Sequence, residues 1–414
     1  MSSRHIGAGS GVSEVESTYA WLRLTASLLI GTVGSVGMWS VVVALPAVQA
    51  EFGVDRGDAS LPYTVTLLFV AVGSMVMGRL VDRFGIVYPV VSGAIALCLG
   101  YILTSQATNI WQFAILHGVV IGFLGSSVMF APLIADISHW FTRRRGIAVA
   151  ICASGSYMAG TVWPPIVQHL IDTVGWRQTH VVVGLICVAT IVPLTLALRR
   201  SPPRQELSAA AIAASGSQSR LGISSNTLLG LLVVAGISCC VAMSMPQVHI
   251  VAYCGDLGYG AARGAEMLSL MLGFGVISRL ISGWIADKIG GLGTVLLGSA
   301  LQALALMLYV PYDGLASLYV ISALFGLSQG GIVPSYAIVV REYFAPGVAG
   351  ARVGTVLMST MLGMALGGWL SGVLYDWTGS YQAAFINGIL WNLLNVAIIA
   401  WLLMRRRSMQ PVAA

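Results

Sequence analysis

The chain has 414 residues, of which 57% are hydrophobic and only 9% are charged, and its mean hydropathy is +0.87. Soluble domains carry about 25% charged residues, so this composition excludes a soluble globular protein and indicates one that is solvated by lipid. The formal net charge of +6 is therefore interpreted as a signal of membrane topology and not of nucleic-acid binding.

The polar start of the chain, residues 1–19, lacks the charged and apolar order of a signal peptide, so we expect the first apolar span to be retained. The cysteines form no CxxC pair and lie almost entirely within apolar spans. They predict small packing residues, with no disulfide framework and no metal site.

Twelve apolar segments follow, and each is expected to be a transmembrane helix. Most have the ~20 residues that cross ~30 Å of hydrocarbon as a helix, and many carry the small residues that let helices approach closely in lipid. They cover residues 21–45, 60–81, 87–105, 110–138, 146–169, 179–198, 226–252, 264–286, 292–310, 315–340, 351–373 and 381–404.

One long polar stretch divides these spans six and six. It is rich in Pro, Ser and Ala, and such a composition is typical of a flexible linker. The expected organisation is an all-α membrane protein with a cytoplasmic tail (1–20), a six-helix bundle (21–198), a cytoplasmic linker (199–225), a second six-helix bundle (226–404) and a cytoplasmic tail (405–414).

The basic residues predict the orientation. With both termini in the cytoplasm, the outer loops hold only Arg56, Arg177 and Arg263, and nearly all other basic residues fall inside. Lys288 is the single lysine among 21 basic residues, which is typical of a GC-rich bacterial genome and favours the bacterial inner membrane.

The two halves repeat each other. "GRLVDRFG" at 78–85 matches "GWIADKIG" at 283–290. Further matches at nearly the same offset are Trp140 and Phe141 with Tyr343 and Phe344, Pro132 with Pro334, Asp172 with Asp376, and Gly175 with Gly379. Duplicated helical bundles with a site at their interface are the architecture of secondary transporters.

The repeated G-x-L-x-D-R-x-G pattern resembles the loop signature of the major facilitator superfamily. A narrower resemblance lies in "WFTRRRGIAVAICASGSYMAG" at 140–160 and "RLISGWIADKIG" at 279–290, which are similar to the monocarboxylate transporter family, including its bacterial oxalate/formate antiporter-like branch. These resemblances imply two pseudo-symmetric bundles of six helices that move an organic anion by alternating access.

Arg279 is the most informative single residue. It precedes Asp287, at the cytoplasmic end of its span, by eight residues, which places it about 12 Å into the membrane. Small residues share its helix face and bulky ones lie opposite, so we expect it to point inward. An intramembrane arginine costs at least ~2.5 kcal/mol, and its planar fork matches a carboxylate. The alternative is a structural pairing with a buried acid or with carbonyl oxygens.

The resemblance implies that this arginine binds the substrate carboxylate. Some family members carry a proton-coupling aspartate one turn earlier, where this chain has Gly275, and the oxalate antiporter has a second cation in span 11, where Thr360 stands here. One buried cation fits one carboxylate, which favours a monocarboxylate.

Other polar or aromatic residues within the spans are candidate cavity residues. Gln329, Ser335 and Tyr336 lie around Pro334, while Trp39, His117 and Tyr157 lie in the first half. His249 and His117 are candidates for proton coupling, and His249 also for an outer gate. For each of these residues, the alternative is packing or a structural hydrogen bond.

Charged residues at the cytoplasmic ends of the spans are expected to latch the outward-open state. The resemblance places Asp82 against the start of span 11, where a carboxylate favours the positive end of a helix. Asp136 is expected to pair with Arg83 or with the arginines at 143–145. The full set is Asp82, Arg83, Asp136, Arg143, Asp287 and Lys288, and the alternative is that they serve only topology and solvation.

No enzyme motif is present: the chain has no HExxH, no P-loop and no nucleophile elbow. We therefore expect neither a cofactor nor ATP as the energy source. The preferred function is secondary transport of a lactate- or pyruvate-like monocarboxylate by a monomer, coupled to protons or to anion exchange. The alternatives are transport of an aromatic acid, a dicarboxylate or a drug with Arg279 structural, and a membrane sensor on a transporter scaffold.

Overall fold

The structure is a computed structural model that describes residues 15–200 and 222–408. Within these ranges the chain folds into helices. They are α1 (Thr18–Gly34), α2 (Val36–Phe52), α3 (Arg56–Phe84), α4 (Val87–Ser105), α5 (Ile110–Leu116), η1 (His117–Gly125), η2 (Ser126–Val128), α6 (Ala131–Ile137), α7 (Arg145–Ala153), α8 (Gly155–Leu194), η3 (Thr195–Leu198), α9 (Ser225–Asp256), α10 (Ala261–Leu308), α11 (Leu315–Gln329), α12 (Ile332–Tyr343), α13 (Pro346–Thr378) and α14 (Tyr381–Ser408).

Ten helical segments of the described chain are long and apolar enough to cross a membrane. Two of them contain a glycine with non-helical backbone angles, Gly175 (φ 80°, ψ 160°) in α8 and Gly290 (φ 78°, ψ 167°) in α10. A side chain rarely adopts such a positive φ, so glycine permits the chain to turn there. Gly85, the repeat counterpart of Gly290, ends α3 with nearly the same angles (φ 77°, ψ 170°).

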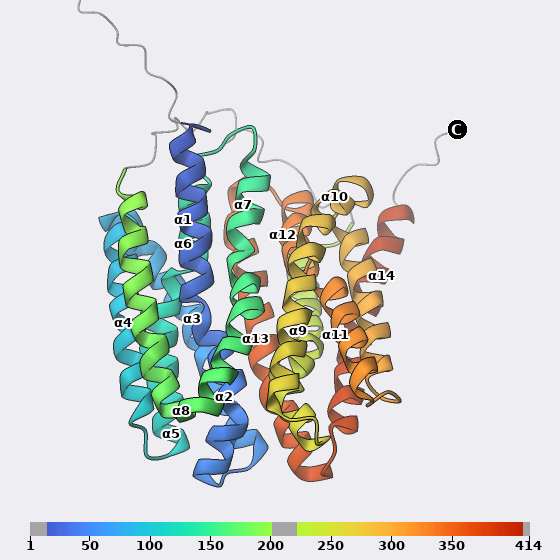
Figure 1. Ribbon diagram of the computed structural model, residues 1–414. Coiled ribbons are helices and arrows are strands. Elements are labelled where there is room, and N and C mark those ends of the chain that lie inside the picture. Colours follow the sequence, from blue (N-terminus) through green and yellow to red (C-terminus); the bar gives the residue numbers. More distant parts are fainter. Residues whose placement is uncertain (1–14, 201–221, 409–414) are drawn as a thin grey trace, which may run out of the picture.

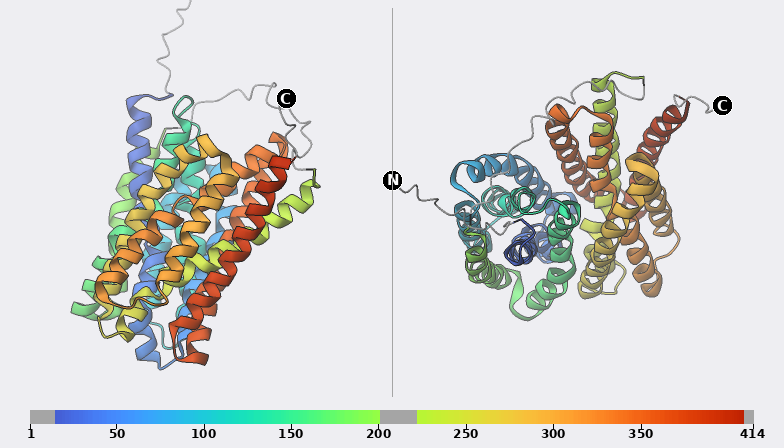
Figure 2. Two further views of the ribbon diagram at one scale, coloured as in Figure 1. Left: turned by 90° about the vertical axis from the view of Figure 1, so that its right-hand side faces the viewer. Right: turned by 90° about the horizontal axis from the view of Figure 1, so that it is seen from above.

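The helices gather into two groups that follow the sequence. Viewed from above, the blue to green helices of the first half lie together beside the yellow to red helices of the second half (Figure 2). The start of α1 and the end of α14 lie at the same end of the molecule, and the turn between α2 and α3 lies at the other (Figure 1). We call these ends the terminal face and the opposite face.

Small residues set how closely the helices pack. A methyl group at Gly326 of α11, or at Gly330 between α11 and α12, would collide with the main chain of α10 at Met271 or Gly275. Gly363 and Gly367 of α13 lie in the same way against α9. Such contacts are the expected means of helix association in lipid, where apolar burial supplies no driving force.

The predicted spans follow the observed helical segments, but spans 5 and 6 share α8 and spans 8 and 9 both lie in α10. Other differences lie at ends and interruptions. α1 begins at Thr18, inside the predicted N-terminal tail (1–20), and α14 continues to Ser408, inside the predicted C-terminal tail (405–414). Span 1 is divided between α1 and α2 at Ser35. Span 4 is not one regular helix, because η1 has π-helical geometry. Most of the predicted linker lies outside the described residues.

Candidate functional site

Arg279 lies on α10 between the two halves of the molecule. Its Nη1 donates a hydrogen bond of 2.7 Å to the carbonyl oxygen of Ala153, and its Nε donates one of 3.3 Å to that of Gly330. Its guanidinium carbon lies 4.1 Å from the ring centre of Tyr157. The opposite side of α10 carries exposed Ile277, Ile281 and Trp284, as the helical pattern predicts. The guanidinium therefore touches an element of each half.

Both carbonyl acceptors lie where a helix is interrupted. Pro334 has no N–H, so it cannot donate to the carbonyl four residues earlier, which is that of Gly330. α11 ends at Gln329 and α12 begins at Ile332, on either side of this point. Ala153 is the last residue of α7. The sequence thus frees main-chain oxygens for a side chain that offers only donors.

Gly275 makes room for the aromatic partner of Arg279. A Cβ atom at position 275 would lie 2.5 Å from Cε1 of Tyr157, which is far closer than van der Waals contact. Tyr157 is 8% exposed, and its ring face lies against the guanidinium. Such a cation–π contact is worth about 2 kcal/mol when it is desolvated. The glycine one turn before Arg279 therefore determines what surrounds the charge.

No carboxylate of the described residues lies within ion-pair distance of Arg279, whereas Arg23, Arg56, Arg177 and Arg263 each have one. The carbonyl oxygens and the ring solvate the guanidinium but leave its full positive charge. A group with these properties can bind a small carboxylate by charge-assisted hydrogen bonds.

A second polar cluster closes the opposite face. Arg56, at the start of α3, donates to the Asp256 carboxylate of α9 at 3.1 and 3.2 Å and to the Tyr381 hydroxyl of α14 at 2.7 Å. The main-chain nitrogens of Arg56 and Gly57 donate to the Asp376 carboxylate of α13 at 2.8 and 2.7 Å. A carboxylate at a helix N-terminus satisfies donors and favours the helix dipole. We call this set the opposite-face closure.

His249 of α9 extends the opposite-face closure toward the centre. Its Nε2 lies 2.7 Å from the carbonyl oxygen of Gly368, and its Nδ1 lies 3.1 Å from the Tyr381 hydroxyl. The imidazole is fully buried. Farther in, the hydroxyl of Thr64 donates to the carbonyl of Ala365 at 2.9 Å, so α3 and α13 are joined over several turns.

The terminal face is different. The residues expected to form latches, Asp82, Arg83, Arg143, Asp287 and Lys288, are all exposed, and none of them forms an ion pair with another described residue. Added methyl groups at Gly78 of α3 and Gly354 of α13 would meet no atom within 4 Å. In the described chain, hydrogen bonds between the halves therefore lie at the opposite face, between Ser269 and Thr161, and at Arg279, and none joins the exposed charges of the terminal face.

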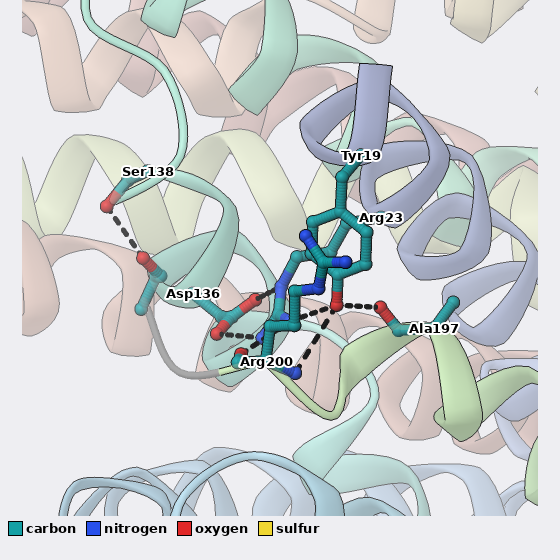
Figure 3. Close-up of polar contacts among 7 residues, drawn as sticks. Tyr19, Arg23, Asp136, Ser138, Ala197 and Arg200 are labelled. Atoms are coloured by element: carbon teal, nitrogen blue, oxygen red, sulfur yellow. Dashed lines mark hydrogen bonds and ion pairs between the residues drawn. The ribbon is translucent and has the colours of Figure 1, made fainter. Parts of the chain in front are cut away.

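Asp136 is the exception among the latch residues, and its expected partner was wrong. It pairs with Arg23 of α1, whose Nε and Nη2 each donate to the carboxylate at 2.8 Å, and not with Arg83 or the arginines at 143–145 (Figure 3). Arg23 is fully buried and also donates to the carbonyl of Arg200 at 3.0 Å. The pair therefore joins the terminal-face ends of three elements within the first half.

Glu16 joins the beginning of the described chain to the loop before α7. Its Oε1 accepts hydrogen bonds from the main-chain nitrogens of Arg144 at 2.8 Å and Thr142 at 3.3 Å. The Arg144 N–H, which stabilises the charged form, lowers the pKa of Glu16. This contact holds the loop against α1 from outside the membrane spans.

His117 and Trp39 lie within the first half. The Nδ1 of His117 lies 2.8 Å from the Thr66 hydroxyl, and its ring stacks on Phe113 with 5.8 Å between centres. The Trp39 indole donates to the carbonyl of Ser156 at 3.0 Å. His117 therefore lies among helices of the first half, whereas Trp39 also lies beside α10 of the second half, because a Cβ atom at Gly160 would contact both its indole and Leu272.

The candidates of the second half lie in two places. Tyr336 donates to Asn395 of α14 at 2.7 Å, and Ser335 and Thr360 donate to carbonyls of their own helices. Gln329 precedes the carbonyl that Arg279 uses, and its Oε1 accepts from Gln247 of α9 at 2.5 Å. Nε2 of Gln329 and Oε1 of Gln247 are buried without a partner in the described chain. Of this group, Gln329 is the residue next to the Arg279 site.

The opposite-face closure is not predictable from the sequence patterns considered above. They place Arg56 only in an outer loop and give Asp256 and Tyr381 no role. Asp376 stands out only as a repeat of Asp172. Its position as an acid at the end of a span was the available signal, because a carboxylate there can cap a neighbouring helix.

Comparisons with known proteins agree with this architecture. A family model described as "Major Facilitator Superfamily" matches residues 27–350 and 292–413. Monocarboxylate transporter 13 of Bos taurus is 27% identical over 369 residues, covering 87% of this chain and 83% of that protein. Monocarboxylate transporter 11 of Homo sapiens is 27% identical over 391 residues, covering 89% and 79%. The MFS-type transporter opdF of Penicillium oxalicum is 27% identical over 356 residues, covering 83% and 80%.

Among solved structures, the chain resembles a bacterial homolog of the human lysosomal transporter Spinster in an inward-facing, unoccupied conformation. The TM-score is 0.71 at 14% identity, covering 96% of this chain and 100% of that one. The occupied form gives a TM-score of 0.68, covering 95% and 97%. The all-helical fold, its long apolar helices and the family match together identify this chain as a multi-pass membrane protein that belongs to the Major Facilitator Superfamily of transporters.

Proposed function

We propose that this protein is a secondary transporter of a small organic monocarboxylate of the lactate or pyruvate type, and that Arg279 binds the carboxylate. One observation carries the proposal: a guanidinium within a membrane span lies between the two halves, is contacted by a carbonyl of each, and has no acidic partner in the described chain. Such a charge is costly in lipid, so a mobile anion is its natural counter-ion.

The proposal includes the membrane topology. Division of α8 and α10 at Gly175 and Gly290 turns ten long helical segments into twelve spans. An undivided α10 of 48 residues would extend about 72 Å, more than twice the hydrocarbon thickness. The positive-inside rule then makes the terminal face cytoplasmic, in a bacterial inner membrane, with bundles at 21–198 and 226–404.

The same assignment makes the structure an inward-open state. The opposite-face closure seals the outer side, and the exposed charges of the terminal face are separated. In the outward-open state, Asp82, Arg83, Arg143, Asp287 and Lys288 close the inner side, while the Asp136 pair keeps the first half together. Similarity to two monocarboxylate transporters supports the substrate class.

Uptake by proteoliposomes tests this function. Wild-type protein is expected to take up labelled lactate or pyruvate, or to exchange it for internal anion, with and without a pH gradient. Arg279→Lys should lower uptake by about 10- to 100-fold, because a charge-assisted hydrogen bond is worth about 1.5–3 kcal/mol and lysine lacks the planar fork.

Arg263→Lys is the matched control, since Arg263 is exposed and pairs with Glu266 on its own helix. It should transport like the wild type. Full transport by Arg279→Lys would show that Arg279 does not bind the substrate carboxylate. Absence of both uptake and exchange for every small acid would reject the monocarboxylate function and leave another substrate or a sensor.

A further inference from the structure

We propose that His249 is a proton-binding switch of the opposite-face closure: the closure forms when the imidazole is neutral, and a proton taken from the outer solution opens it. This inference rests on the proposed alternating access and adds its regulation. It starts from the protonation state that the hydrogen bonds of His249 require.

The hydrogen bonds allow one tautomer. The carbonyl oxygen of Gly368 only accepts, so Nε2 of His249 carries a hydrogen. The hydroxyl of Tyr381 accepts from Nη1 of Arg56 at 2.7 Å and is left to donate its own hydrogen. Its remaining neighbour is Nδ1 of His249 at 3.1 Å, and the phenol hydrogen finds an acceptor there only when Nδ1 is unprotonated. The closed network therefore contains a neutral imidazole.

A second proton has no place in this network. The second proton would lie on Nδ1 of His249 and point at the hydroxyl hydrogen of Tyr381. The hydroxyl could accept from both Arg56 and Nδ1 only if it rotated its own hydrogen away from His249 and lost that hydrogen bond. It would also create a buried cation beside the guanidinium of Arg56. Burial of an uncompensated charge without hydrogen bonds is strongly unfavourable.

The neighbouring acids are already engaged. Asp256 of α9 pairs with the Arg56 side chain, and Asp376 of α13 accepts two main-chain N–H groups. The remaining titratable neighbours are phenols: the rings of Tyr253 of α9 and Tyr375 of α13 each contact the ring of Tyr381 of α14. No element packed here therefore offers a free carboxylate to a protonated His249.

Opening changes this balance. Arg56 belongs to α3 of the first half, while α9, α13 and α14 belong to the second, so separation of the halves removes the Arg56 contact and exposes the imidazole to water. An exposed histidine titrates near pH 6.5. Protons therefore bind the open form better than the closed form, and a ligand that prefers one state shifts the population toward it. Closure is therefore most stable above this pH and weakens as the outer pH falls below it.

Hydrogen–deuterium exchange of the full chain in lipid nanodiscs tests the switch without any substrate. Labelling times at pH 5 and pH 8 are matched for the intrinsic chemical rate. For wild type, the exchange rate of residues 56–64 and 368–376 should rise by up to roughly 30-fold in acid. This is the largest increase in the open population between pH 8 and pH 5 that one group titrating near 6.5 in the open form can produce. If the exchange rate does not rise in acid, the proposal is overturned.

His249→Gln should abolish this pH response, because the glutamine amide can donate to Gly368 and accept from Tyr381 but does not titrate. His169→Gln, a change at an exposed histidine of α8, should retain it. Tyr381→Phe should raise exchange at both pH values. An unchanged response in His249→Gln would assign the proton to another group and overturn the proposal.

The wild-type measurement alone remains decisive if a variant does not fold. The test is also separate from the proposed substrate. A pH response without any lactate transport would reject the monocarboxylate function and keep the switch, whereas lactate transport without a pH response would do the reverse.

Discussion

Gly275 shows how one missing side chain defines the candidate site. Its absent Cβ lets the ring of Tyr157, from the other half, lie against α10 and cover the guanidinium of Arg279. An acidic residue at this position would both displace the ring and neutralise the charge one turn away. The glycine thus keeps Arg279 free of an internal counter-ion.

Gly275→Asp is therefore expected to reduce lactate affinity at neutral pH by at least about tenfold, since the new carboxylate competes for a charge-assisted hydrogen bond. Isothermal titration of purified protein at pH 7 measures the change. Gly275→Ala separates the steric contribution, because it adds the Cβ atom without a charge and should weaken binding less than Gly275→Asp; equal weakening in both variants would contradict the electrostatic explanation.

The interruption between α11 and α12 acts at the scale of an element. Pro334 frees the carbonyl of Gly330, and Arg279 of the neighbouring helix uses it. The sequence showed that this span would bend, because a proline and two glycines lie together, but it did not show which side chain would take the freed oxygen. That pairing depends on the distance between two helices.

Pro334→Ala should return an N–H to the helix and compete for the Gly330 carbonyl. Arg279 then loses a charge-assisted hydrogen bond worth about 1.5 kcal/mol in the empty protein, so a carboxylate should bind roughly tenfold more tightly. Isothermal titration with lactate measures the change. Pro132→Ala, at the repeat position in α6, should leave affinity unaltered. Weaker binding in Pro334→Ala would show that the carbonyl does not compete with substrate.

Helix positions were predictable because each span is a long apolar run, and the observed boundaries of α4 and α9 follow such runs closely. Interruptions were less predictable. η1 has π-helical geometry, and its glycines at 118, 122 and 125 lie directly against residues of α3 and α4, a packing that involves three helices together. The partner of Asp136 was missed for the same reason, since Arg23 is 113 residues away.

At the scale of the whole molecule, the duplicated sequence is used asymmetrically. Asp376 caps the start of α3 across the two halves, whereas its repeat counterpart Asp172 accepts from Gln168 of its own helix at 2.8 Å. The inward pointing of Arg279 could be predicted from its helical face, but its contacts with both halves could not, because they depend on the relative placement of two bundles. The same limit applies to the opposite-face closure.

Asp376→Asn should weaken that closure, because the N-terminal cap of α3 loses its charge and one acceptor. Loss of a cap costs about 1 kcal/mol, which corresponds to a roughly fivefold rise in the open population. Hydrogen–deuterium exchange of residues 56–64 at pH 8 measures it. Asp172→Asn is the matched control and should have no effect on this segment; an equal effect of both variants would argue for general destabilisation.

The two carbonyl oxygens at Arg279 have a consequence for the energetics of a transport cycle. Under the proposed function, an arriving anion would displace acceptors that already solvate the guanidinium, so its affinity would be the difference between two sets of hydrogen bonds. Because the two carbonyls belong to different halves, the guanidinium of the empty site also joins the halves and keeps hydrogen-bond acceptors within the membrane span.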